Sequence, residues 1–69
     1  MHLYVCLIFN ADDAVVIGAA IVDAVTKADA LTKAKAVLAE HPGAGGFELW
    51  LAGERVQTYF PGRNGHTAG

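Results

Sequence analysis

The feature that most constrains this chain is an apolar run near its start that offers no polar face. Residues Leu3–Phe9 are all apolar and rich in β-branched and aromatic types, which favours a strand. A strand without polar alternation needs cover on both faces. No basic residue precedes the run, and Asn10 with the acidic residues after it ends it after seven residues. We therefore expect neither a signal peptide nor a membrane span.

A second apolar run, Ala14–Val25, follows the turn-forming residues Asn10–Asp13 and predicts an antiparallel hairpin. Gly18 within it indicates a bulge or a close backbone approach. Asp12 and Asp13 are interpreted as a solvated hairpin tip, because two carboxylates do not supply the six or more oxygens that calcium prefers.

The segment from Thr26 to Glu40 predicts a helix. Thr26 suits the N-cap, and Asp29 three residues later resembles a capping box. An apolar stripe at helical spacing is expected to pack on the sheet, and it comprises Ala30, Leu31, Ala34, Val37 and Leu38. The glycine-rich segment His41–Gly46 is predicted to be a connector. A phosphate-binding loop would instead precede a helix.

A second hairpin is predicted from strands at Phe47–Leu51 and Arg55–Phe60, with Gly53 at the first central position of its turn. Strand alternation places Trp50 on one face with four polar or aromatic neighbours, namely Glu48, Arg55, Gln57 and Tyr59. Residues 61–69 hold no apolar anchor and are predicted to be a disordered tail.

The sequence thus predicts one α+β domain over residues 1–60, with ββαββ order and a four-stranded antiparallel sheet that carries one helix on one face. A single helix cannot cover both faces. One of two sets from the first strand must line the uncovered face: either Tyr4, Cys6 and Ile8, or Leu3, Val5, Leu7 and Phe9. Monomers rarely expose so large an apolar patch. We therefore expect a homodimer, formed by sheet-on-sheet or edge-to-edge packing.

Chain length supports the same expectation. A monomer of 69 residues buries only about 60% of its unfolded surface and is marginally stable. The single cysteine, Cys6, forms no internal disulfide, and His2, His41 and His66 do not have metal-ligand spacing. Oligomerisation is the remaining means of stabilisation. A net charge of −2 argues against a nucleic-acid partner. No metal or cofactor is expected.

The motif Glu48-Leu49-Trp50, followed by a glycine turn and Arg55-Val56, resembles the C-terminal hairpin of small bacterial ββαββ proteins that carry an ELW-x-G motif. Those proteins share an apolar first strand and a helix start similar to residues 23–31. Gly53 stands one residue later here, after Leu51 and Ala52. The resemblance implies the fold and no particular activity.

Little in the sequence indicates catalysis, because the chain lacks serine and Cys6 lies in an apolar strand. The favoured hypothesis is a non-enzymatic, homodimeric interaction or regulatory module. Its candidate binding or interface residues are Trp50, Tyr59, Arg55, Tyr4, Cys6 and Ile8. The alternative is a small-molecule binder or enzyme with a pocket between helix and sheet or across the dimer. A reduced cysteine and the lack of an export signal predict a cytoplasmic protein.

Overall fold

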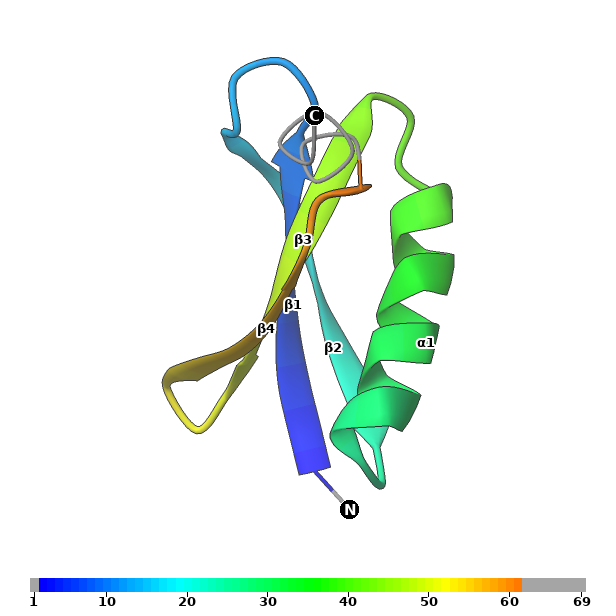
Figure 1. Ribbon diagram of the computed structural model, residues 1–69, viewed down its shortest axis with the longest axis vertical. Helices are drawn as coiled ribbons and strands as arrows, with labels where there is room; N and C mark the ends of the chain where they lie inside the picture. The colour runs from blue at the N-terminus through cyan, green and yellow to red at the C-terminus, as the bar shows by residue number, and fades with distance from the viewer. Residues whose placement is uncertain (1, 62–69) are drawn as a thin grey trace.

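Two β-hairpins joined by one helix form this protein (Figure 1). The computed structural model describes residues 2–61, so most of the predicted tail, residues 62–69, lies outside the described part. In chain order the elements are β1 (His2–Asn10), β2 (Val16–Ala24), α1 (Lys27–Ala39), β3 (Ala44–Leu51) and β4 (Glu54–Tyr59). The predicted α+β, ββαββ fold is confirmed.

The four strands form one antiparallel sheet in the order β2-β1-β3-β4. The apolar strand β1 is therefore an interior strand, paired with β2 on one side and with β3 on the other. Val5, for example, lies opposite Ile21 of β2 and opposite Trp50 of β3. The connection from β2 through α1 to β3 passes β1 and places the two hairpins side by side (Figure 1).

The hydrophobic core lies between α1 and one face of the sheet. Its buried members are Tyr4, Cys6, Ile8, Val22, Ala24, Ala30, Ala34, Phe47 and Leu49. The two helix residues among them are alanines, so the helix backbone approaches the sheet closely. Leu31, Val37 and Leu38 pack around this core and are partly buried, as the predicted apolar stripe requires.

The helix begins where the sequence predicts. Thr26 has an extended backbone, and its hydroxyl accepts a hydrogen bond from the Asp29 amide at 3.1 Å. The Asp29 carboxylate accepts in turn from the Val25 amide at 3.3 Å and pairs with Lys33 at 3.2 Å. The Thr26 contact satisfies one of the amide groups that the first turn of a helix leaves without an intrahelical partner, and the Asp29 contacts fix the segment that enters the helix.

The predicted turn after β1 is also present. The Asn10 side chain accepts from the Asp12 amide at 2.7 Å, and the Asp13 side chain accepts from the Val15 amide at 3.3 Å. Beyond this turn β2 starts only at Val16, two residues later than predicted, and Ile17 is the extra residue of a bulge.

Gly18, next to that bulge, also marks a close approach. A Cβ atom there would lie 3.1 Å from Nε2 of His41, which follows the end of α1. The sequence predicted a bulge or a close backbone approach at Gly18. The close approach occurs at Gly18, and the bulge occurs at the preceding residue. The small residue lets the C-terminal end of the helix lie against β2.

The prediction of a connector over His41–Gly46 is wrong in its second half, because β3 already begins at Ala44. Gly45 and Gly46 are strand residues in close contact with other segments. A Cβ atom on Gly45 would meet the Ala11 backbone, and one on Gly46 would overlap the Phe60 ring and the Tyr59 carbonyl. These glycines serve packing within the sheet, and tight turning is confined to Gly43, whose φ is 84°.

The turn of the second hairpin differs from the predicted one. Leu51 pairs with Glu54, so Ala52 and Gly53 are the two central residues, with φ of 53° and 81°. Positive φ at both positions defines a type I′ turn, and Gly53 occupies the second central position. Ala52 adopts a left-handed conformation that costs a non-glycine residue roughly 1–2 kcal/mol.

The open face of the sheet

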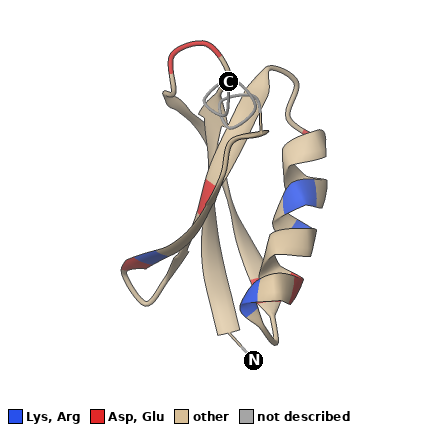
Figure 2. Ribbon diagram, viewed as in Figure 1, with Lys and Arg blue, Asp and Glu red and all other residues tan. Residues whose placement is uncertain are grey.

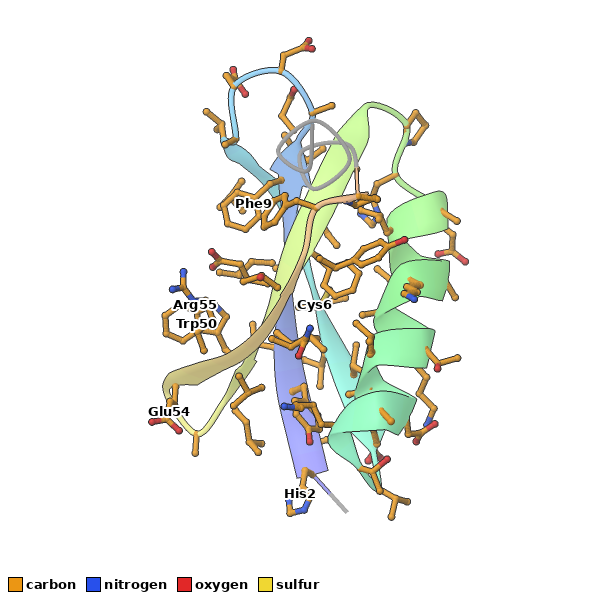
Figure 3. The ribbon with its side chains drawn as sticks, in the orientation of Figure 1. His2, Cys6, Phe9, Trp50, Glu54 and Arg55 are labelled. Atoms are coloured by element: carbon orange, nitrogen blue, oxygen red, sulfur yellow. The ribbon has the colours of Figure 1, made fainter. Side chains whose placement is uncertain are left out.

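The face of the sheet opposite α1 has no covering element among residues 2–61 (Figure 1). We call it the open face. Its side chains are Leu3, Val5, Leu7 and Phe9 of β1, Val16, Ala19, Ile21 and Asp23 of β2, Glu48 and Trp50 of β3, and Arg55 and Thr58 of β4. Trp50 and Arg55 project to the side of the sheet away from the helix, as Figure 3 shows.

Large apolar side chains are exposed to solvent at one end of the open face. Leu3 is 63% exposed, Ile21 is 65% exposed and Val5 is 38% exposed. On the covered face of the same strands, Ile8 and Cys6 are fully buried. β1 contains no Lys, Arg, Asp or Glu, and Figure 2 draws it in tan. This end of the sheet thus resembles a core that lacks its second layer.

At the other end, the chain covers part of the open face itself. Phe60 follows β4, and its ring contacts the Phe9 ring edge-on, with 5.7 Å between centroids. The ring also occupies the space above Gly46, where a side chain would collide with it. Leu3, Val5 and Ile21 lie toward the end of the sheet away from this ring. Val15, Val16 and Ile17, near the turn after β1, are also exposed.

Three polar groups on the open face, those of Glu48, Trp50 and Arg55, are paired with one another. The Glu48 carboxylate accepts a hydrogen bond from the Trp50 indole at 3.0 Å through one oxygen and from the Arg55 guanidinium at 3.2 Å through the other. The Glu48 side chain is only 17% exposed. Its charge is neutralised within the chain, so this region can be buried without leaving an unpaired carboxylate away from water.

The structure corrects one set of predicted interface residues. Tyr4, Cys6 and Ile8 lie under α1 and are almost completely buried, so the alternative set from β1 lines the uncovered face. The choice follows from β2, whose covered face carries small residues at Gly18, Ala20 and Ala24. This pattern is visible in the sequence, because a helix packs closely only on a sheet face where the neighbouring strand carries small side chains.

Tyr59 is corrected too. Strand alternation placed it with Trp50, but a bulge in β4 makes Val56 an extra residue between the pairs Leu49–Gln57 and Trp50–Arg55. The bulge leaves Arg55 beside Trp50 and turns Tyr59 and Gln57 to the α1 side. There the Tyr59 ring lies 5.2 Å from the Phe47 ring, and the Lys35 ammonium lies 4.8 Å from its centroid.

Among residues 2–61, the reactive side chains are not clustered into one site. Burial raises the pKa of the Cys6 thiol from 9.0 to about 11, so it is a neutral, weakly nucleophilic group at pH 7. Nδ1 of His41 lies 2.9 Å from the Val37 carbonyl oxygen at the end of α1. Within residues 2–61 no cluster of three His, Cys, Asp or Glu side chains could hold a metal ion.

A depression of about 310 Å³ is lined by four consecutive β4 residues, Arg55, Val56, Gln57 and Thr58. It therefore follows an edge strand. A small-molecule binder was expected to use a pocket between helix and sheet or across a dimer interface, and this depression does not lie between helix and sheet.

No helix of the described chain is long and apolar enough to cross a membrane. Comparison with protein-family models, curated proteins and solved structures finds no match. The fold defines a small α+β domain with one covered and one open sheet face. Its function is therefore inferred from the residues of the open face.

Proposed function

We propose that this protein is a non-enzymatic interaction or regulatory module that works as a homodimer, in which the open faces of two copies pack together. The observation that carries the proposal is the bare apolar end of the open face, where Leu3 and Ile21 are each more than half exposed on regular strands. Full burial of a Leu, Val or Ile side chain contributes about 1.5–3 kcal/mol. A second layer over this face thus adds substantially to a domain of marginal stability.

A second copy of the chain suits this surface for two reasons. Two-fold packing brings the same apolar residues together from both sides, as in sandwiches whose two inner faces form one core. Two of the charged residues on the open face, Glu48 and Arg55, neutralise each other within one copy. The third, Asp23, lies opposite Leu3 near the end of edge strand β2 and is exposed. Identical faces can therefore meet without repulsion between like charges where Glu48 and Arg55 lie.

A lysine placed among the exposed apolar residues of the open face tests the proposal. Wild-type protein and Val5→Lys are compared by sedimentation equilibrium at micromolar concentration. The control is Ala36→Lys, which adds the same charge at an exposed position of α1. We expect wild type and the control to sediment as dimers or larger assemblies and Val5→Lys to lose the open-face contact. A wild-type mass of 7.2 kDa, that of one chain, would overturn the proposal.

The compartment belongs to the same proposal. A free cysteine buried in the core, with no second cysteine in the chain, suits a reducing compartment such as the cytoplasm. The regulatory role would then act through assembly, since the exposed apolar surface is available only in the free subunit.

A further inference from the structure

The two edges of the sheet are protected to different degrees. Edge strand β4 has six residues and begins with the charged pair Glu54 and Arg55. Edge strand β2 has nine residues and a single charge, Asp23, near its end. Natural edge strands are shielded by charges, prolines, bulges or short length, because their free amide and carbonyl groups otherwise pair with another strand. The edge of β2 has little of this protection.

Two side-chain hydrogen bonds show which backbone groups point outward. The Lys33 ammonium donates to the Asp23 carbonyl of β2 at 2.7 Å, and the Gln57 amide donates to the Thr58 carbonyl of β4 at 3.2 Å. In an antiparallel strand both backbone groups of a residue point to the same side, and the side alternates along the chain. The outward residues of β2 before Asp23 are therefore Ile21 and Ala19.

The outward groups of the two edges have different surroundings. On β4, the Thr58 carbonyl already accepts from Gln57, and the bulge at Val56 interrupts the edge. On β2, the Lys33 contact stops at Asp23, and no charged or proline residue lies between Val16 and Val22. The segment Gly18–Val22 thus presents a regular, uncharged edge.

The boundaries of this segment are symmetric. The bulge residue Ile17 limits it at one end, and the Lys33-bonded Asp23 limits it at the other. Each boundary is three residues from Ala20. A two-fold axis at Ala20 would therefore bring the bulge of one copy opposite the Lys33-bonded residue of the other. No partner other than the same strand needs to be assumed to obtain this match.

We infer that the Gly18–Val22 edge of β2 pairs antiparallel with the same segment of a second copy, with Ala20 opposite Ala20 and Ala19 opposite Ile21. The outward amides and carbonyls of Ala19 and Ile21 then bond across the two-fold axis. The small side chains Gly18, Ala19 and Ala20 permit close strand approach on both faces of the sheet.

This inference goes beyond the open-face dimer and uses a different surface. Edge pairing alone extends the sheet and leaves the open faces uncovered. Together, the two contacts join two open-face dimers into a tetramer. Each contact can be broken separately.

The test uses proline substitutions on the two edges. Ala19→Pro removes an outward amide of β2, and the matched control Thr58→Pro removes an outward amide of β4. Proline is tolerated on an edge where its missing amide faces away from the sheet. We expect Ala19→Pro to halve the wild-type mass in sedimentation equilibrium and Thr58→Pro to leave it unchanged. An Ala19→Pro mass equal to that of wild type would overturn edge pairing.

Hydrogen exchange on the wild-type protein gives a measurement that does not depend on a variant folding. Edge pairing predicts that the Ala19 and Ile21 amides exchange on the order of tenfold or more slowly at high than at low protein concentration. Unprotected exchange at every concentration would contradict it. A mass lowered by Val5→Lys alone supports only the open-face contact, and a mass lowered by Ala19→Pro alone supports only the edge contact.

Discussion

The two faces of the sheet are built from alternate residues of the same strands, yet only one of them holds the helix. On the covered face, β2 supplies Val22 and three small residues, Gly18, Ala20 and Ala24, which leave room for α1. On the open face, β2 supplies the larger Ile21, which is 65% exposed. The difference indicates that the face of β2 with more small residues is the one on which the helix packs closely. The other face then depends on a second molecule for cover.

The largest expected effect comes from truncating the same residue type on each face. Leu49→Ala removes a fully buried side chain and should lower the free energy of unfolding by about 2–5 kcal/mol at any protein concentration. Leu3→Ala, on the open face, should cost less in dilute solution and more as the protein associates. Urea unfolding at two protein concentrations measures both. If both variants lost the same unfolding free energy at both protein concentrations, the two faces would not differ in the way proposed.

The pH dependence of the unfolding free energy tests whether water reaches the Cys6 thiol on the covered face. The folded pKa of Cys6 is about 11, whereas the unfolded thiol titrates near 9.0. Between these values the unfolded chain loses the proton and the folded chain keeps it, so stability falls as pH rises, by about 2–3 kcal/mol in total. Unfolding of wild type and Cys6→Ala is compared at pH 8 and pH 11. A wild-type loss no larger than that of the variant would indicate a hydrated thiol.

A matched pair of leucine substitutions tests the role of the small residues. Ala20→Leu enlarges a side chain between β2 and α1 and should destabilise the fold by about 1–3 kcal/mol. Ala19→Leu adds the same atoms to the open face, where we expect a change of less than about 1 kcal/mol for the dissociated chain in dilute solution. Thermal unfolding measures both. A similar loss in the two variants would show that the helix does not require small neighbours.

The smallest effect is expected at the turn of the second hairpin, which lies away from both faces. Ala52 has a φ of 53°, and Ala52→Gly removes the penalty for a left-handed conformation. We expect a gain of about 0.5–1 kcal/mol in unfolding free energy with no change in assembly. A loss of stability would mean that the Ala52 side chain makes a favourable contact.

Local patterns in the sequence were sufficient for the elements and the fold class. The helix start at Thr26 and the turn after Asn10 depend on side chains that bond nearby amides, and the structure contains these bonds. The strand order and the start of β3 at Ala44 were not predicted, because both depend on pairing between residues distant in sequence.

The candidate site was predicted only in part, for a physical reason. A single extra residue in a strand reverses the face of every residue that follows, and the bulge at Val56 separates Tyr59 from Trp50 in this way. The choice between the two faces of β1 depended on the sizes of side chains in β2. That information was present in the sequence but required knowledge that the two strands lie side by side.

The most direct test of open-face association uses Trp50, the only tryptophan, which is half-buried on the open face beside Val5. Its fluorescence emission is recorded while the protein is diluted from micromolar concentration, in parallel with the mass by light scattering. We predict a shift to longer wavelength as the assembly dissociates, and a long-wavelength emission for Val5→Lys throughout. A constant emission with a mass of 7.2 kDa at every concentration would contradict association through the open face.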